Sequence, residues 1–150
     1  YYANENGYNS RLDEVQASIL NFKLKKIDNF INKRRMLAKY YLKNLNFNEI
    51  SIPKENSYCK HVYHLFTIYH PQGSYIIEKL KKNKIQTRKI YPYPIHKMKA
   101  YSKIIKNKNK LKNSEKKSKG IICLPLYPEL TKREVMKVCN SFNKILENLN

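Results

Sequence analysis

The sequence has little of several residue types, and each shortage excludes a class of protein. Its three cysteines, Cys59, Cys123 and Cys139, lie far apart and form no Cys-x-x-Cys pair. This pattern disfavours both a structural zinc site and a disulfide framework, and a reducing, cytoplasmic compartment fits better. The four histidines form no pattern typical of metal ligands. The sequence therefore predicts no metal centre.

Long hydrophobic runs are also lacking, because no apolar stretch approaches the roughly 20 residues that a membrane-spanning helix needs. The chain begins at Tyr1 with neither Met nor a charged leader followed by an apolar stretch. We therefore expect no signal peptide, and we expect the chain to be part of a longer protein. With 150 residues it has the length of one ordinary domain with its own core. These features predict a soluble protein that does not contact a membrane.

Acidic residues are scarce, which makes the chain strongly basic. It has 31 Lys and Arg against 11 Asp and Glu, a formal net charge of +20. Such a charge attracts polyanions, so one hypothesis is a nucleic-acid-binding module with a continuous positive face and steep salt dependence. The alternative is compositional drift, since Lys, Asn, Ile and Tyr are all abundant and most lysines are scattered, apart from a dense run at residues 103–119. No RNA-binding aromatic signature, zinc knuckle or helix-turn-helix pattern accompanies them, which favours drift.

Helical periodicity dominates the first third of the chain. Ser10-x-x-Asp13 matches a capping box, and apolar residues follow at helical spacing from Leu12 to Leu45, with a polar interruption at residues 33–35. The pattern predicts one long helix or two abutting helices. At about 1.5 Å per residue the whole stretch spans roughly 50 Å, so part of it is expected to pack on something outside this chain.

Short strands, helices and loops are predicted next. Residues 61–70 read as a strand inside a sheet, because β-branched and aromatic side chains fall on both faces. Ser74 is expected to cap a short helix that ends near Asn83, and residues 85–91 are expected to form another strand. Prolines in the segment 91–96 prevent regular pairing, so a shaped loop is predicted there.

The last third is predicted to contain one strand and one clear helix. Residues 120–124 read as a short apolar strand, and residues 124–130 as a second loop pinned by prolines. Thr131-x-x-Glu134 is a capping box that opens a helix with one continuous apolar face. A further helix is expected in the lysine-rich stretch before the strand. The order predicts a two-layer α/β unit: a long helix, then a small sheet packed with helices, with no repeats.

Five motifs carry a resemblance to a known family. They are GYNSRLDEVQASIL with K-L-x-x-I-D at residues 7–28, R-R-x-x-A-x-x-Y-x-x-x-L at 34–45, HVYHLF at 61–66, IQT with YPYPIH at 85–96, and LPLYPELT at 124–131. In this order and spacing they resemble the C-terminal portion of the DegT-type (DegT/DnrJ/StrS) aminotransferases, which use pyridoxal 5'-phosphate and act on nucleotide sugars. Within this family, the sequence N-S-R-L-D more closely resembles members that aminate 3-keto or 4-keto deoxysugars.

The resemblance implies a fold-type-I transferase, in which a large cofactor domain precedes a smaller α/β domain and the intact enzyme is a homodimer. Residues 1–45 would form the long connecting helix region and residues 46–150 the small α/β domain, with the large domain absent. The family's catalytic lysine lies upstream of the G-x-N motif, and no lysine of this chain has a matching context. The resemblance therefore implies an intact transaminase with glutamate as the expected amino donor, in surface-polysaccharide or deoxyaminosugar biosynthesis. This chain alone is expected to be inactive.

Four residues are candidate site residues. Asn9 matches the family asparagine that reaches across the dimer to the partner's cofactor phosphate, a role that suits an amide beside the free amides of a helix N-terminus; the alternative is that it only helps to cap the helix. Arg11 is expected in the first helical turn, where it would bind the nucleotide-sugar diphosphate or pair with an acidic neighbour. Tyr91 and His96 flank the loop that lines the family's sugar pocket. His96 would donate to a sugar hydroxyl or phosphate, or would be a plain surface histidine.

Three positions depart from the family pattern. Ile90 stands where a histidine usually precedes Tyr91, which puts one substrate contact in doubt. Lys84 replaces a glycine, so its turn is expected to be remodelled, and Ser18 replaces an alanine in a packed helix. Related sugar dehydratases keep the scaffold but replace the lysine, and such a dehydratase stays open as an alternative enzyme.

Overall fold

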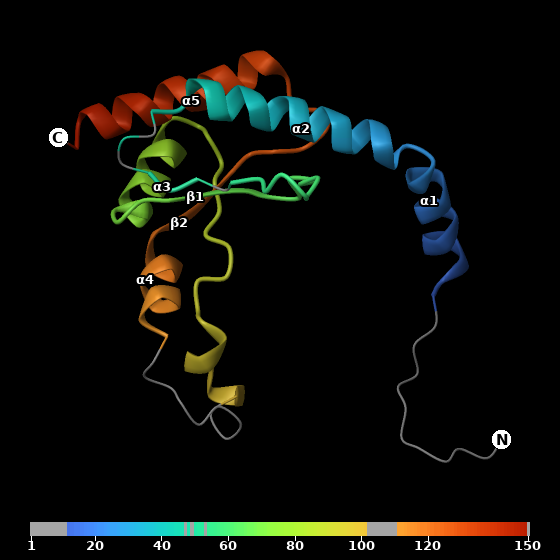
Figure 1. Cartoon of the computed structure of the whole chain (residues 1–150), viewed down its shortest axis with the longest axis horizontal. Coiled ribbons are helices and arrows are strands. Elements are labelled where there is room, and N and C mark those ends of the chain that lie inside the picture. Colours follow the sequence, from blue (N-terminus) through green and yellow to red (C-terminus); the bar gives the residue numbers. More distant parts are fainter. Residues whose placement is uncertain (1–11, 47, 49, 53, 102–110, 150) are drawn as a thin grey trace.

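A computed structural model describes residues 12–46, 48, 50–52, 54–101 and 111–149 of the chain. The described part is mainly helical and contains one two-stranded sheet (Figure 1). Its elements in chain order are α1 (Glu14–Leu24), α2 (Ile27–Asn44), β1 (Phe66–Tyr69), α3 (Gly73–Lys82), the 3₁₀ turns η1 (Ile95–Lys97) and η2 (Lys99–Tyr101), α4 (Lys112–Gly120), β2 (Ile121–Leu124) and α5 (Lys132–Glu147). The expected long helix is thus two abutting helices, and the predicted small sheet is present.

The first helix begins later than the capping-box motif predicts. The N-cap of α1 is Asp13, whose Oδ1 accepts hydrogen bonds from the amides of Val15 at 2.9 Å and Gln16 at 3.3 Å. The prediction that Ser10 caps this helix with Asp13 as its capping-box partner is therefore wrong. A short acidic side chain in extended backbone is itself a strong cap, so Asp13 needs no partner upstream.

The sheet is smaller than the sequence pattern predicts. β1 and β2 pair antiparallel from Phe66 opposite Leu124 to Tyr69 opposite Ile121. In the described ranges the sheet is extended by isolated bridges alone, from Ser51 to Tyr69 and from Arg88 to Cys123. The predicted strand 61–70 is therefore limited to its second half, and the predicted strand 85–91 is a single bridge. Tyr63 explains the first limit, because its left-handed φ of 46° cannot continue an extended strand, and Tyr91, with φ 51°, ends the extended backbone after Ile90.

The predicted caps of two helices further along the chain have different outcomes. The N-cap of α3 is Gln72 and has no side-chain capping bond, so the prediction that Ser74 caps it is wrong, whereas Asn83 does end it. The Thr131–Glu134 capping box of α5 is confirmed, with both reciprocal bonds present. The Thr131 amide and then its hydroxyl donate to the Glu134 carboxylate, and these two bonds lower the pKa of Glu134.

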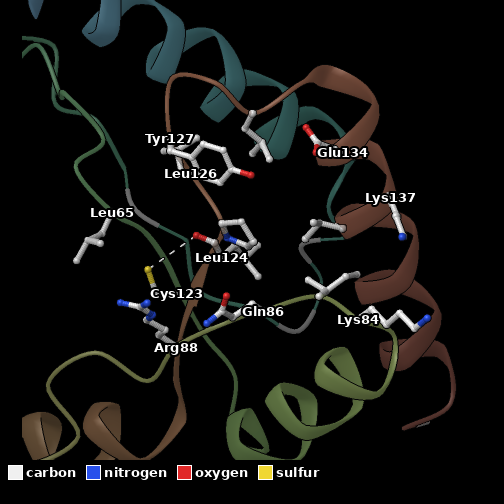
Figure 2. A pocket seen from close by; sticks show the side chains of 14 residues that line it. Leu65, Lys84, Gln86, Arg88, Cys123, Leu124, Leu126, Tyr127, Glu134 and Lys137 are labelled. Carbon is white, nitrogen blue, oxygen red and sulfur yellow. Dashed lines mark hydrogen bonds between the residues drawn. The ribbon is translucent and has the colours of Figure 1, made fainter.

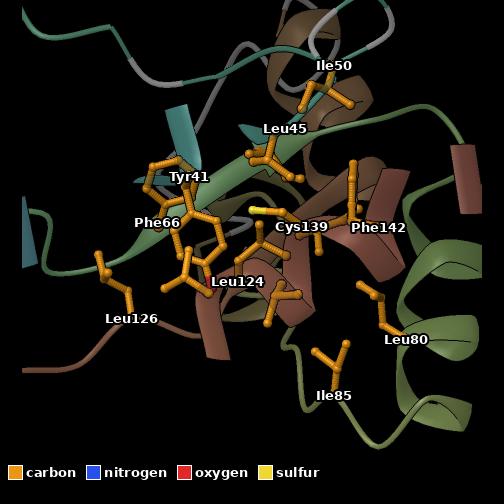
Figure 3. Packing of buried hydrophobic residues seen from close by; sticks show 14 of the residues in the cluster. Tyr41, Leu45, Ile50, Phe66, Leu80, Ile85, Leu124, Leu126, Cys139 and Phe142 are labelled. Carbon is orange, nitrogen blue, oxygen red and sulfur yellow. The ribbon is translucent and has the colours of Figure 1, made fainter. Parts of the chain in front are cut away.

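The core lies between the sheet, α2, α3 and α5 (Figure 3). In α2, Tyr41 is fully buried, stacks on Phe66 with ring centroids 4.8 Å apart, and donates a hydrogen bond to the carbonyl of Pro125 at 2.8 Å. Burial raises the pKa of its phenol, and burial in α5 raises the pKa of the Cys139 thiol to about 11. Cys139 is thus a core residue with little thiolate character rather than a nucleophile. The core places α2 and α5 side by side above the sheet (Figure 1).

Helix α1 lies apart from this core and buries none of its residues. Large apolar side chains are exposed along it and just before and after it: Leu12, Val15, Ile19, Leu20, Phe22, Leu24 and Ile27. An apolar surface of this kind is what the expected packing against an absent part of the protein requires. No helix in the described ranges is long and apolar enough to cross a membrane.

We predict that the 150-residue chain by itself binds a hydrophobic dye and self-associates, because α1 exposes its apolar side chains to water. Dye fluorescence and light scattering measure both effects. A variant with Ile19→Lys and Phe22→Lys should reduce both signals, while Lys23→Glu, which leaves the apolar surface intact, should not. A monodisperse chain that melts cooperatively and binds little dye would show that α1 needs no partner.

Candidate functional site

The loop that follows the Arg88 bridge exposes two tyrosines. Tyr91 is 79 % exposed, and its neighbour Tyr93 is also exposed. Pro92 and Pro94 keep the segment out of the sheet, so it is irregular up to Pro94 and then forms η1. The predicted shaped loop is confirmed, and Tyr91 is free to contact a ligand or another part of the protein.

His96 lies in the same segment but in the opposite environment. It is only 4 % exposed, and its Nε2 lies 3.0 Å from Oε1 of Glu115 in α4. Lys97 approaches the same carboxylate at 3.4 Å, and the bond from His96 followed by that from Lys97 lowers the pKa of Glu115. Of the two alternatives for His96, the plain surface histidine is therefore wrong. His96 ties the loop to α4, and the structure does not place it on the exposed side with Tyr91.

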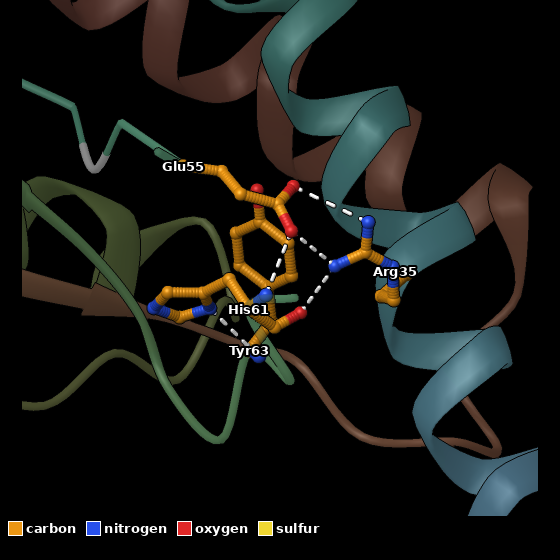
Figure 4. Close-up of polar contacts among 4 residues, drawn as sticks. All are labelled: Arg35, Glu55, His61 and Tyr63. Atoms are coloured by element: carbon orange, nitrogen blue, oxygen red, sulfur yellow. Dashed lines mark hydrogen bonds and ion pairs between the residues drawn. The ribbon is translucent and has the colours of Figure 1, made fainter. Parts of the chain in front are cut away.

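A second polar cluster fixes the segment before β1 (Figure 4). Arg35 of α2 donates from Nη1 to Oε1 of Glu55 at 2.6 Å and from Nη2 to Oε2 at 3.3 Å, and Nη1 also donates to the carbonyl of His61 at 2.6 Å. The His61 amide donates back to Oε1 of Glu55 at 2.7 Å. The pKa of Glu55 is lowered, chiefly by the Arg35 bond and then by the His61 amide. This cluster of Arg35, Glu55 and His61, here called the clamp, holds residues 55–61 against α2.

The neighbouring arginine, Arg34, binds backbone carbonyls that follow this segment and one carbonyl in the loop after β2. Arg34 Nη1 donates to three backbone carbonyls, those of Leu126 at 3.0 Å, His64 at 3.1 Å and Tyr63 at 3.4 Å. In the sequence this arginine pair only interrupts an apolar helical pattern. Its role could not be inferred there, because its acceptors are backbone carbonyls far along the chain.

A cavity of about 410 Å³ adjoins the clamp and Tyr91. Its lining combines hydrogen-bonding side chains with apolar ones: His61, Val62, His64, Leu65, Thr67, Ile90, Tyr91 and Ile121. None of these lining residues carries a carboxylate. The structure thus brings the predicted site residue Tyr91 together with two histidines that the sequence did not single out as ligands.

A larger cavity of about 550 Å³ lies beyond Leu65, between the bridge at Arg88 and the start of α5 (Figure 2). Its apolar floor includes Leu124, Leu126 and Val138, and Gln86 reaches into it. Burial raises the pKa of the Cys123 thiol in its wall, which lowers its thiolate fraction. Residues from the 61–66, 85–96 and 124–131 motifs meet at the two cavities, and Leu65 lines both.

Two of the non-glycine residues with positive φ line these cavities, Lys84 the larger one and Tyr91 the smaller one. Among the described residues, the third such residue is Tyr63. Lys84 has φ 59°, a conformation that glycine adopts at no steric cost, so its turn keeps a glycine-like shape and the expected remodelling is not needed. Strained backbone of this kind is typical of sites where a loop must present side chains to a ligand.

The other two candidate residues, Asn9 and Arg11, lie outside the described residues. Within the described ranges, no group of three or more His, Cys, Asp or Glu could hold a metal ion.

Comparisons with known proteins agree on one family. Residues 1–143 match the sequence profile of the DegT/DnrJ/EryC1/StrS aminotransferase family. The chain is 36 % identical over 138 residues to dTDP-3-amino-3,6-dideoxy-alpha-D-galactopyranose transaminase of Aneurinibacillus thermoaerophilus, which covers 92 % of this chain and 38 % of that protein. The chain thus spans about two-fifths of the length of this curated relative.

Solved structures show the same partial coverage. The crystal structure of S. venezuelae DesV in complex with a ketimine intermediate matches with a TM-score of 0.90 and 29 % identity, over 98 % of this chain and 40 % of that chain. NtdA from Bacillus subtilis with bound cofactor PMP matches with a TM-score of 0.80 and 29 % identity, over 94 % of this chain and 34 % of that chain. The described fold is therefore a part of the fold of these proteins.

Proposed function

Because the chain belongs to the DegT/DnrJ/EryC1/StrS aminotransferase family, we propose that it is the C-terminal portion of a pyridoxal-phosphate-dependent sugar aminotransferase. The intact enzyme transfers an amino group from an amino acid, glutamate, to a keto-deoxysugar carried on a nucleotide, and it acts as a cytoplasmic homodimer. The observation that carries the proposal is the match over residues 1–143 to an aminotransferase family, together with relatives that include sugar transaminases. Coverage of about two-fifths of those relatives supports a division into a large domain, residues 1–45 as connecting helix region and residues 46–150 as small domain.

The chain's own share of this reaction is to form one wall of the substrate site. The cofactor supplies the electron sink for amino-group exchange when it is bound. Asn9 would hold its phosphate in the partner subunit, and Arg11 would bind the sugar-nucleotide diphosphate. Tyr91 is exposed beside a cavity that lacks carboxylates, which suits an anionic sugar nucleotide. His96, buried against Glu115, keeps the loop that carries Tyr91 in place.

The proposal is tested on the intact protein, with the residues upstream of Tyr1 restored. With glutamate and a 4-keto-6-deoxy or 3-keto-6-deoxy sugar nucleotide, we predict an amino sugar product by mass spectrometry and one mole of 2-oxoglutarate per mole of product. Loss of water from the sugar without amine incorporation would instead identify a dehydratase.

The 150-residue chain alone is the matched control. Incubated with pyridoxal phosphate and reduced with borohydride, it should carry no stoichiometric label at any one lysine, because none has the family's catalytic context. Stoichiometric labelling at a single lysine would contradict the assignment of the catalytic lysine to the upstream part.

A further inference from the structure

His61 is held more firmly than its exposed position requires. The clamp fixes its backbone on both sides, through the amide bond to Glu55 at 2.7 Å and the carbonyl bond from Arg35 at 2.6 Å. Its ring is fixed as well. Nδ1 accepts a hydrogen bond from the Tyr63 amide at 2.9 Å, and the ring centroids of His61 and Tyr63 lie 4.3 Å apart. Backbone and side chain are therefore both constrained, although the side chain faces water.

These contacts determine which ring nitrogen carries the proton. A backbone amide can only donate, so Nδ1 of His61 must accept, and in the neutral ring the proton is on Nε2. Nε2 points away from the clamp (Figure 4) and has no hydrogen-bond partner among the described residues. The clamp thus presents one oriented N–H donor whose partner is not supplied by the described chain.

The surroundings of this donor suit an anionic acceptor. His61 lines the cavity of about 410 Å³ together with the hydrogen-bonding side chains of His64, Thr67 and Tyr91. None of the lining residues is acidic, and the carboxylate of Glu55 is already bound by the Arg35 guanidinium. A phosphate oxygen in this cavity would therefore meet donors without a competing negative charge.

We propose that Nε2–H of His61 binds the diphosphate group of the sugar nucleotide, with Arg35 and Glu55 as positioning residues that fix the ring. This inference rests on the proposed function and adds a substrate contact to it. The apolar part of the lining includes Val62, Leu65 and Ile90, and it would face the less polar portion of the same ligand.

Two amide variants of the intact protein separate the roles of the two ring nitrogens. His61→Asn places an amide oxygen near the position of Nδ1, so it keeps the acceptor for Tyr63 but lacks the Nε2 donor. His61→Gln extends an amide N–H toward the position of Nε2 and keeps the donor. Calorimetric titration with inorganic pyrophosphate and with dTDP, UDP and GDP should show a loss of about tenfold to a hundredfold for His61→Asn, as expected for one hydrogen bond to a charged group. His61→Gln should recover most of that affinity.

Steady-state kinetics should agree with the titrations. His61→Asn should raise KM for the sugar nucleotide more than it lowers kcat. Arg35→Lys, which loses the bidentate contact with Glu55, should weaken pyrophosphate binding less than His61→Asn does, and melting temperatures should show that each variant folds.

The failures of the two proposals are distinguishable. If the wild-type protein aminates a sugar nucleotide and His61→Asn binds diphosphates as tightly as wild type, the His61 contact is wrong and the proposed function stands. If the wild-type protein aminates no sugar nucleotide yet binds pyrophosphate in a His61-dependent way, only the proposed function is wrong. If it binds no diphosphate, both are wrong.

Discussion

Replacing Gly120 with alanine is expected to lower the melting temperature of the intact protein sharply, because there is no room for a Cβ atom at this position. That atom would meet the carbonyl oxygen of His70 and the ring carbon Cε2 of Tyr69. The carbonyl cannot yield by changing rotamer, since the His70 amide donates to the carbonyl of Gly120 at 3.1 Å and the His70 carbonyl accepts from Gly73 at 3.0 Å. Overpacking against fixed neighbours costs about 1–3 kcal/mol or more.

The same crossing makes Gly73 equally intolerant, because its Cβ would meet the backbone of Gly120. Differential scanning of Gly120→Ala and Gly73→Ala therefore tests two close approaches at Gly120, that of Gly120 to His70 and Tyr69 and that of Gly73 to the Gly120 backbone. Lys119→Ala is the matched control, since this exposed neighbour should change stability by about 0.5 kcal/mol or less. A Gly120→Ala protein that melts with wild type would mean that Gly120 does not lie this close to His70 and Tyr69.

This contact also shows what the sequence could not reveal. Gly73 and Gly120 are two of only three glycines in the chain, but no local pattern says that they meet. The Thr131–Glu134 capping box was predictable because both partners lie within one helical turn. The predicted lengths of the strands at 61–70 and 85–91 were too long. Residue composition reports only on the segment itself, whereas strand length also depends on the partner strand, β2, which has only four residues.

The candidate site also has one part that the sequence predicts and another that it does not. Proline positions predicted the loop that carries Tyr91, and the structure confirms it. Burial of His96 depends on Glu115, and the clamp depends on an arginine and a glutamate twenty residues apart in sequence. Such pairs follow from the tertiary fold, so periodicity and motif spacing do not show them.

Replacing Asn9 with alanine in the intact enzyme is expected to weaken retention of pyridoxal phosphate by about tenfold to a hundredfold, the value of one hydrogen bond to a charged group. The competing expectation, that Asn9 only caps the helix, loses its basis because Asp13 already caps α1. Asp13→Ala is therefore the matched control. It should destabilise the helix by about 1 kcal/mol and leave cofactor retention nearly unchanged.

A cross-dimer role for Asn9 also predicts complementation between two inactive parents. A heterodimer of an Asn9→Ala subunit and a subunit lacking the upstream catalytic lysine has one site with both defects and one with neither. Under limiting cofactor, mixed dimers should therefore recover about half of the activity of a wild-type dimer, whereas each parent homodimer stays inactive, because the phosphate contact is one charged hydrogen bond supplied by the opposite subunit. Activity of mixed dimers separated by two affinity tags measures this. If such dimers form and remain inactive, Asn9 acts within its own subunit, and the assignment across the dimer is wrong.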